Sequence, residues 1–471
     1  MTSERPRSAL RWGVLGLVFL GPLPFGSVQP GMVLAIELFA AALGLGTIFL
    51  LARDEEARRT LPRMPMAVCA GVIALGVLQL VPLPFGIAER FNPTAELVRP
   101  LLPHLGGASP TVTWTVASEG TRDALLRFVA YALIGATAFV AFDSSRARRH
   151  FALGLMAAAV FQAAYGSGEY LTGRQHIFGF VKKYYLDSAT GTFINRNHFA
   201  TFLAMALPFA ITLAIPRETG HAPRHWRQRL VGLSKAPALL SVFAIVGAMV
   251  IWMGLLLSHS RAGLVASLVG AAVVLVHFHG RRARRWAVAI GGAVLMLLLT
   301  LDLAQAPGER FFAVSDDLSA KAGRLSVWRD AWELVAARPV FGWGLGTFES
   351  TFPLVQSANI DVHYDHAHND WVEWATEGGV CALTAAVLLL AAALRRGDAA
   401  TRGAVAAIAA HAVWDFSLRI PAVAATAAAI VGVGCSAYAA SMASRAETSA
   451  FPPLSMNDSN HSSRLSKFQI R

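Results

Sequence analysis

Charged side chains are scarce in this chain. Only 15% of its 471 residues are Asp, Glu, Lys or Arg, whereas 55% are hydrophobic. A water-soluble domain needs a more charged surface, so the composition argues against an ordinary soluble globular protein. Lipid is the expected solvent, and the sequence predicts an integral membrane protein.

Cysteine is rare as well, and its three positions lie inside apolar runs: Cys69, Cys381 and Cys435. Neither a disulfide framework nor a CxxC metal site is therefore available. The formal net charge is +12, but the arginines fall between apolar runs and no nucleic-acid-binding module is recognisable. We expect a lipid bilayer, and not nucleic acid, as the partner of these cations.

Long apolar segments follow one another along the chain. A segment of about 17 to 25 such residues crosses the hydrocarbon layer of a bilayer, and we expect about twelve of them. Their predicted ranges are 11–29, 32–51, 65–83, 124–142, 151–171, 198–215, 238–257, 263–279, 286–304, 371–394, 403–417 and 420–440. The predicted fold class is all-α, a polytopic membrane helical bundle.

The distribution of Lys and Arg predicts the orientation of this bundle. With the N-terminus inside, the inside loops carry about 26 of these residues and the outside loops about 14. Both termini are then cytoplasmic. The predicted parts are nine spans (1–304), a long outside loop (305–370), three more spans (371–442) and a disordered cytoplasmic tail (443–471).

The long outside loop has a helical pattern of its own. Leu325, Trp328, Trp332 and Val335 recur at helical spacing, and Pro339 ends the pattern. An amphipathic helix on the membrane surface and a helix that packs on the bundle both fit this spacing.

Two outside arginines are candidate anion ligands. Arg261 lies in the SHSR turn (258–261) between two spans, and Arg324 opens the predicted loop helix. A helix N-terminus favours an anion, and guanidinium groups can hold a phosphate bidentately. For Arg261, a snorkelling position at a helix end is the alternative.

The stretch DVHYDHAHNDWVEWATEGG (361–379) re-enters the membrane and carries His368. Imidazole titrates near neutral pH, so His368 is a candidate general base. Glu373 and Glu377 follow Asp370 along one helix stripe and are candidates for binding substrate or pairing with arginines. A metal site of the HxxHxH type, starting at His363, stays open as an alternative to a site without metal.

A third outside stretch, GTFINRNHFATFL (191–203), starts a span with Asn195, Arg196, Asn197 and His198 at its mouth. Amide and imidazole groups there can bind sugar hydroxyls or cap the helix.

Two other patterns favour a structural role over a functional one. HAVWDFSLRIPA (411–422) places His411 and Asp415 one turn apart within a predicted span, which is typical of structural hydrogen bonding. The alternate glycines of FGWGLGTF (341–348) indicate a turn more than a phosphate cradle.

Four of these stretches, in this order, resemble the O-antigen ligase and polymerase superfamily of bacterial envelope glycosyltransferases. They are FINRNHFA, SHSRAG, GRLSVW followed by GWGLG, and HNDWVEWATEGG, which together cover roughly residues 191–379.

The resemblance implies a GT-C-like enzyme of the bacterial inner membrane with a periplasmic active site and no cofactor or metal. It would move a glycan from undecaprenyl pyrophosphate to a glycan or lipid A-core acceptor. The family's essential arginines look like Arg261 and Arg324, and its histidine looks like His368, with His366 as the neighbouring alternative. Polymerase and ligase both fit, with a weak preference for polymerase.

Two other classes of function remain open. A transporter or flippase of lipid-linked oligosaccharide predicts repeated halves and broken helices in matching positions, and neither is clear in the sequence. A non-catalytic scaffold of an envelope polysaccharide assembly complex predicts that Arg324 and His368 can be replaced without loss of product.

Overall fold

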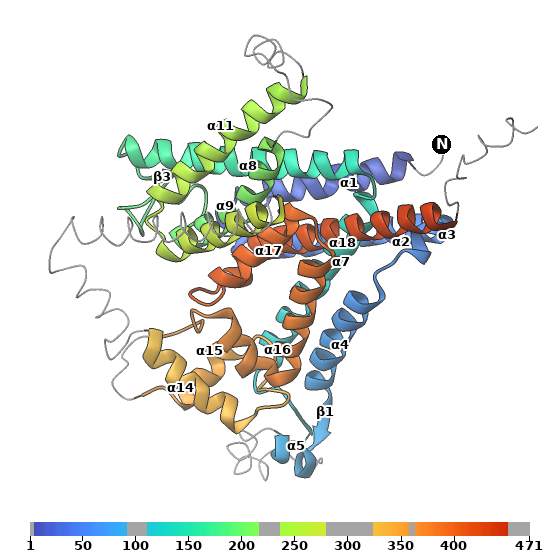
Figure 1. Cartoon of the computed structure of the whole chain (residues 1–471). Helices are drawn as coiled ribbons and strands as arrows, with labels where there is room; N and C mark the ends of the chain where they lie inside the picture. Colours follow the sequence, from blue (N-terminus) through green and yellow to red (C-terminus); the bar gives the residue numbers. More distant parts are fainter. Residues whose placement is uncertain (1–3, 92–110, 216–235, 279–323, 358–362, 451–471) are drawn as a thin grey trace, which may run out of the picture.

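The computed structural model describes residues 4–91, 111–215, 236–278, 324–357 and 363–450 (Figure 1). Helices dominate these residues, and four short strands form two antiparallel pairs, β1 with β2 and β3 with β4. The elements are α1 (Glu4–Leu20), η1 (Phe25–Ser27), α2 (Pro30–Arg53), α3 (Glu55–Arg59), α4 (Arg63–Leu80), β1 (Pro82–Pro84), α5 (Phe85–Phe91), β2 (Thr111–Thr113), α7 (Ser118–Ala141), α8 (Ser145–Leu171), β3 (His176–Ile177), β4 (Phe180–Val181), α9 (Arg196–Ala214), α11 (Ala236–Leu257), α14 (Arg324–Ala337), α15 (Phe348–Thr351), η3 (Phe352–Leu354), α16 (Asp370–Arg396), α17 (Ala399–His411), η4 (Ser417–Arg419) and α18 (Pro421–Ala450). One more helix spans Arg261–Phe278.

Nine helices among the described residues are long and apolar enough to cross a membrane. Of the other three predicted spans, the first corresponds to α1, which has 17 residues, and the eleventh to α17, which has 13. The predicted span 286–304 lies outside the described residues. The chain is thus an all-α, multi-pass membrane protein, as its composition predicted.

Several helices begin earlier than the predicted spans, because polar residues that precede the apolar run form the first turn of the helix. The side chains of Ser144, Asn195, Asn369 and Asp398 each accept a hydrogen bond from a backbone N–H in the turn that follows. Such caps begin helices before their apolar runs begin. At the other end of the chain, α18 continues to Ala450, so the chain stays helical past residue 443; residues 451–471 of the predicted tail lie outside the described residues.

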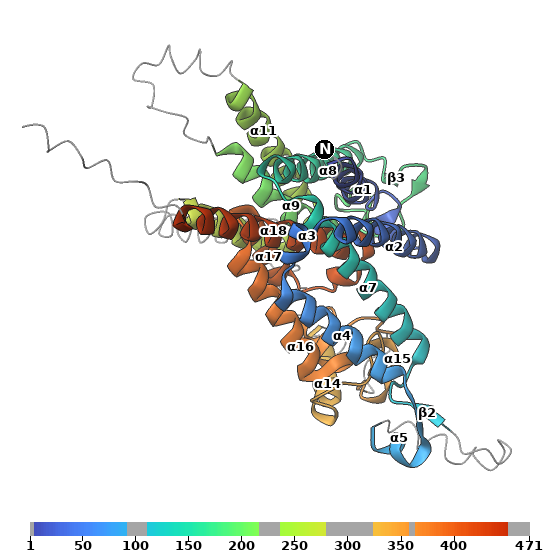
Figure 2. The ribbon, with the colours of Figure 1, turned by 90° about the vertical axis from the view of Figure 1, so that its right-hand side faces the viewer.

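Helices α9 and α18 lie at the centre of the bundle, because most of their residues are buried, whereas most of α4 and α11 is not. Small residues allow the close approach of α18 to α7: a Cβ added at Gly432 would lie 2.1 Å from Gly135 O. The outer helices α2 and α11 expose large apolar side chains such as Leu38 and Phe243, as lipid contact requires. Figure 2 shows α4 between α7 and α16.

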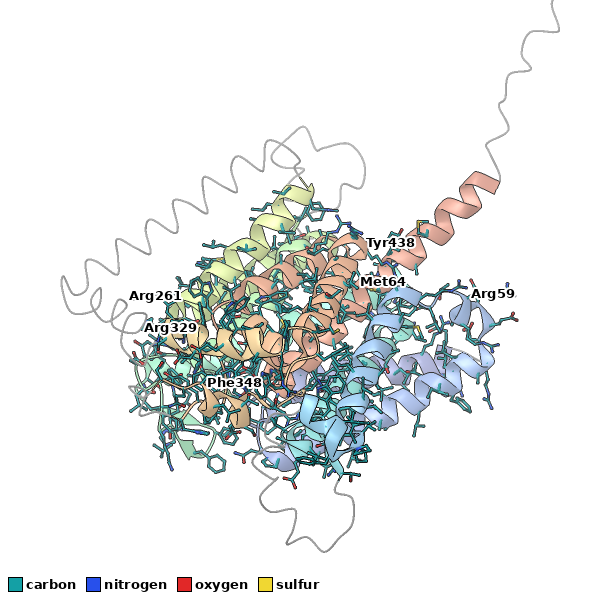
Figure 3. The ribbon with its side chains drawn as sticks, turned by 90° about the horizontal axis from the view of Figure 1, so that it is seen from below. Arg59, Met64, Arg261, Arg329, Phe348 and Tyr438 are labelled. Carbon is teal, nitrogen blue, oxygen red and sulfur yellow. The ribbon has the colours of Figure 1, made fainter. Side chains whose placement is uncertain are left out.

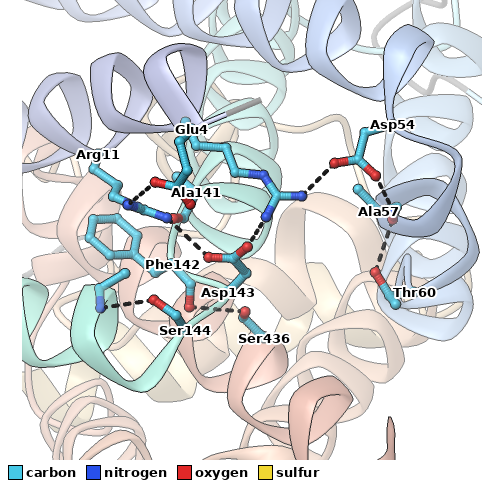
Figure 4. A network of polar contacts seen from close by, with 12 residues as sticks. Glu4, Arg11, Asp54, Ala57, Thr60, Ala141, Phe142, Asp143, Ser144 and Ser436 are labelled. Atoms are coloured by element: carbon cyan, nitrogen blue, oxygen red, sulfur yellow. Dashed lines mark hydrogen bonds and ion pairs between the residues drawn. The ribbon is translucent and has the colours of Figure 1, made fainter. Parts of the chain in front are cut away.

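Arginines of α1 tie together the end of the bundle that is predicted to be cytoplasmic (Figure 4). Arg7 pairs with Asp54, at the start of α3, at 2.6 Å and also with Asp143 between α7 and α8. Arg11 pairs with Asp143 at 3.1 Å and donates from Nε to Ala141 O at 2.6 Å. Because Asp54 lies between α2 and α3, these pairs fix α1 to the end of α2 and to the turn between α7 and α8.

Helix α16 is interrupted at Gly379, whose φ of 59° and ψ of −153° are not helical. The backbone N–H groups of Val380 and Cys381 donate instead to Pro339 O at 2.8 Å and to Val340 O at 3.2 Å. The segment after α14 therefore satisfies the backbone groups that the break frees, as a break inside a membrane bundle requires.

The predicted loop helix exists as α14, but it packs on a different face from the one its apolar spacing suggested. Val327, Ala331 and Leu334 are buried, whereas Leu325 and Trp332 are 49% and 60% exposed. The helix thus packs on the protein and also presents an apolar stripe outward. The packing on the protein agrees with one of the two predicted roles, and the position on the membrane surface stays a prediction.

Candidate functional site

His368 lies on the segment that precedes α16, and its backbone φ of 51° is rare for a residue other than glycine. Its ring packs edge-on against Phe416, with ring centroids 4.9 Å apart. Its Nδ1 lies 3.8 Å from Oδ1 of Asp415, and its side chain is 30% exposed. The Nδ1 edge of the imidazole therefore meets a buried carboxylate, while part of the ring reaches the surface.

Asp415 is fully buried and is shared by two histidines. Its Oδ2 lies 3.6 Å from Nε2 of His198 and accepts a hydrogen bond from Ser417 Oγ at 2.9 Å. Burial alone would raise the pKa of Asp415, but the contact with His368 and the nearby His198 and His411 hold it below its usual range. Asp415 therefore carries a negative charge beside His368.

The predicted pairing of His411 with Asp415 inside one span is not what the structure shows. Helix α17 ends at His411, and Asp415 lies in the turn that follows. His411 Nδ1 is instead 3.0 Å from Thr201 Oγ1 of α9. Ser417 Oγ, 3.4 Å from His411 Nδ1, donates to Asp415, so His411 and Asp415 are linked by structural hydrogen bonding. Only their placement within one span was wrong, because an apolar run does not reveal where a helix ends and the chain turns back.

Arg324 begins α14, and its Nη1 donates to Trp414 O at 3.0 Å. Trp328, one turn further along α14, donates from Nε1 to Ala367 O at 2.9 Å. Arg324 thus contacts Trp414 while His368 contacts the next two residues, Asp415 and Phe416. The structure brings the predicted arginine and the predicted histidine to the same short segment, 414–416.

The SHSR turn is linked to this cluster through α9. Ser260 Oγ donates to Oδ1 of Asn197 at 2.8 Å, and the side chain of Asn195 caps α9 by accepting from Asn197 N at 2.8 Å. Arg261 itself is exposed and begins the next span. In Figure 3 it is seen at the same edge of the molecule as Arg329 of α14.

Arg196 is directed to a different group of residues. Its Nη1 is 3.2 Å from Ser188 Oγ and 3.7 Å from Asp187 Oδ2, and its guanidinium lies 5.4 Å from the centroid of the Tyr185 ring. The sequence grouped Arg196 with Asn195, Asn197 and His198, and the structure separates it from the histidine cluster by these contacts.

Glu373 and Glu377 are buried, with side-chain exposures of 1% and 2%. Arg419 pairs with Glu373 at 3.1 Å through Nε and with Glu377 at 2.8 Å through Nη2. Burial alone would lower the pKa of Arg419, but the charges of the two carboxylates raise it above its usual range. The two carboxylates thus pair with an arginine, which was one of the predicted roles; the arginine is Arg419, to which the sequence assigned no role.

The other histidines of the HxxHxH stretch have separate partners. His363 Nε2 is 2.9 Å from Glu349 Oε1, and His366 Nδ1 is 2.8 Å from Glu373 Oε1. Burial alone would lower the pKa of His366, but the charge of Glu373 raises it above its usual value. Across the described ranges, no group of three or more His, Cys, Asp or Glu side chains is arranged to hold a metal ion.

The glycines of FGWGLGTF contact protein backbone. Added Cβ atoms would lie 2.3 Å from Glu377 C at Gly342 and 2.5 Å from Gly120 O at Gly346. Trp343 N and Gly344 N donate to backbone oxygens of α16. This segment is a turn packed against the broken helix, in agreement with the structural role that the pattern favoured.

The cluster joins the start of α9, the start of α16 and the end of α17, which the predicted topology places on one side of the membrane. The chain is therefore a multi-pass helical membrane protein in which a histidine, a buried carboxylate and an arginine meet where these helices begin and end. The model of the O-antigen ligase family matches residues 243–387 of the chain, and this match supports the resemblance to the O-antigen ligase superfamily that the ordered motifs indicated. The matched range contains Arg261, Arg324 and His368 but not Asp415 or the FINRNHFA stretch. No curated protein matches the chain.

Proposed function

We propose that this protein transfers a glycan from undecaprenyl pyrophosphate to an acceptor hydroxyl. The observation that supports this most directly is that Arg324 and His368 both contact the segment 414–416, which carries the buried Asp415. We place the protein in the bacterial inner membrane and the site at its periplasmic face, in agreement with the excess of Lys and Arg in the opposite loops.

His368 acts as the general base in this proposal. Asp415 holds the Nδ1 side of the ring, so Nε2 takes the proton of the acceptor hydroxyl. The resulting imidazolium is stabilised by the buried negative charge of Asp415, as in other histidine–carboxylate pairs. The freed oxygen attacks the anomeric carbon opposite the pyrophosphate, and attack from that side inverts the anomeric centre.

Arg324 and Arg261 bind the leaving group. As the bond from the anomeric carbon to the pyrophosphate oxygen breaks, the bonding electron pair stays on that oxygen, and guanidinium groups stabilise its charge. In this proposal they take the part that a divalent cation has in many phosphate-leaving reactions, so the reaction is metal-independent.

The other residues predicted to bind substrate act either directly on the glycan or indirectly, by holding parts of the site in place. Asn195 and Asn197 lie at the start of α9, where their amide groups can bind glycan hydroxyls, and His198, buried against Asp415, acts by positioning that carboxylate. Arg196, directed to Ser188 and Asp187, can bind another part of the glycan. Glu373 and Glu377 act indirectly, by holding Arg419 and the start of α16 in place. A second lipid-linked glycan as acceptor gives a polymerase, and a lipid A core gives a ligase.

A transporter of lipid-linked oligosaccharide is the second candidate, because a broken helix such as α16 is common in transporters. In this chain, however, two N–H groups just after the break already bond to Pro339 and Val340. They are therefore occupied by protein, which favours a structural break over a substrate site.

Transfer in proteoliposomes tests the proposal. With a defined lipid-linked donor and acceptor, Arg324→Ala and His368→Ala should each lower the rate at least a hundredfold, because positioned acid–base groups and charge-stabilising groups contribute about that much. A chelator should leave the wild-type rate unchanged. A donor that grows longer identifies a polymerase, and glycan on the lipid acceptor identifies a ligase.

Matched controls are available on the same two segments. Arg329→Ala removes an exposed arginine of α14, and His363→Ala removes an exposed histidine of the same stretch; both should keep the wild-type rate. Normal transfer by Arg324→Ala and His368→Ala would end the catalytic assignment and favour the scaffold, and strong inhibition by the chelator would return the metal site to consideration.

A further inference from the structure

A pair of tryptophans lies at the edge of the candidate site. Trp414 directly precedes Asp415, its carbonyl oxygen accepts the hydrogen bond from Arg324, and its side chain is 40% exposed. The Trp328 ring lies beside it, with centroids 6.0 Å apart at an interplanar angle of 47°. A large aromatic surface is therefore open within one residue of the carboxylate that contacts His368.

The backbone around Trp414 and the indole of Trp328 are both held in place. Trp328 Nε1 donates to Ala367 O, and Trp414 N donates to His411 O at 2.9 Å. Among the described residues, the indole N–H of Trp414 makes no hydrogen bond. A partly exposed indole on a fixed backbone, with an available donor, is suited to a ligand that is apolar on one side and rich in hydroxyl groups at its edge.

The charge distribution of the indole ring determines which part of a lipid-linked glycan can pack against Trp414. The face of an indole is negative, so it repels a pyrophosphate and attracts groups with positively polarised hydrogens. The C–H face of a pyranose ring has such hydrogens, and its hydroxyl groups can accept a hydrogen bond from an indole N–H. The anion then belongs with Arg324 and the sugar with Trp414.

We propose that Trp414, supported by Trp328, is a sugar-stacking subsite that holds the pyranose ring next to the reacting centre. This inference rests on the proposed glycan transfer. The ring comes either from the donor or from the acceptor glycan, and the same chemistry would recognise both.

Kinetics of Trp414→Ala, Trp414→Phe and Trp332→Ala test the subsite. Trp414→Ala should raise KM for one of the two glycan substrates about tenfold, which corresponds to about 1.4 kcal/mol, with a much smaller change in kcat. Trp414→Phe should raise it less, because a smaller ring remains. Trp332 of α14 is 60% exposed and has no place in the proposed site, so Trp332→Ala should behave as wild type.

The substrate whose KM rises identifies the source of the ring: the donor or the acceptor. Unchanged KM for both substrates in Trp414→Ala would overturn the subsite. An equal effect of Trp332→Ala would also overturn it, since both tryptophans would then act as general membrane-interface anchors.

A binding measurement separates this inference from the proposed reaction. The soluble glycan, released from the lipid-linked donor by mild acid, is titrated against His368→Ala and against the double variant with Trp414→Ala. Tighter binding by the single variant supports the subsite even if His368→Ala still transfers glycan, and equal binding overturns it. Sugar-free undecaprenyl pyrophosphate should bind both variants equally.

Discussion

At the scale of single residues, the buried carboxylate of Asp415 contacts two histidines that lie far from it and from each other in the sequence. Asp415 contacts His368 through one oxygen and His198 through the other, although these three residues come from three different stretches of the chain. At 3.8 Å and 3.6 Å both histidine contacts are longer than a hydrogen bond, so Asp415 acts on the two rings in this structure through its charge.

Asp415→Asn should lower glycan transfer at least a hundredfold, because an amide keeps the shape of the side chain but no longer stabilises an imidazolium at His368. The pH at which the rate reaches half its maximum should move to lower pH than in wild type, because the lost negative charge no longer favours the protonated form of the base; loss of packing alone does not produce this shift. Initial rates from about pH 5.5 to 9 measure both effects. Asp365→Asn, on the exposed part of the histidine stretch, is the control. A wild-type rate and pH profile for Asp415→Asn would remove it from the mechanism.

At the scale of elements, the break in α16 sets the position of the site. The half of α16 that begins at Asp370 carries Glu373 and Glu377. After it the helix breaks, and the segment that follows α14 accepts hydrogen bonds from the backbone N–H groups just beyond the break. Backbone hydrogen bonds thereby join the segment that follows α14 to α16 on both sides of the break. Arg324 is the first residue of α14 and His368 lies two residues before α16, so the position of each helix sets the position of one of the two side chains.

Gly379→Ala should destabilise the protein by at least about 2 kcal/mol, since a side chain is strained at this φ and its Cβ would lie 2.5 Å from Val340 C. The melting temperature in detergent measures the loss. A matched control is Gly71→Ala on α4, where an added Cβ meets nothing within 4 Å and alanine favours the helix. Equal melting temperatures for Gly379→Ala and wild type would show that the chain relaxes around this position.

At the scale of the whole molecule, the predicted topology and the observed packing agree with each other. The segments of the candidate site come from stretches predicted to lie outside or from the outer ends of predicted spans, such as residues 414–416 of the span 403–417. The arginine network of α1 lies among loops predicted to lie inside. The sides of the membrane themselves are tested by labelling.

In a variant without Cys69, Cys381 and Cys435, single cysteines at position 329 and at position 58 should react with an impermeant maleimide from opposite sides of the membrane. Position 329 should be labelled in intact cells, and position 58 only after the membrane is permeabilised, because Arg58 lies in a predicted inside loop. Mass-tag gel shifts measure the labelling. Labelling of position 58 in intact cells would reverse the topology and remove the site from the periplasm.

The sequence alone determined that the protein lies in a lipid bilayer, its fold class and most of its spans. Crossing a bilayer requires long apolar runs, and these runs and the charge bias of the loops between them are visible residue by residue. The sequence also pointed to Arg324 and His368 through ordered motifs. Only the tertiary structure decided which side chains meet: that Asp415 serves His368 and His198, that Arg419 takes Glu373 and Glu377, and that Trp414 stays open. Such contacts depend on where helices end and how they pack, and residues far apart in the chain share no periodicity that could reveal them.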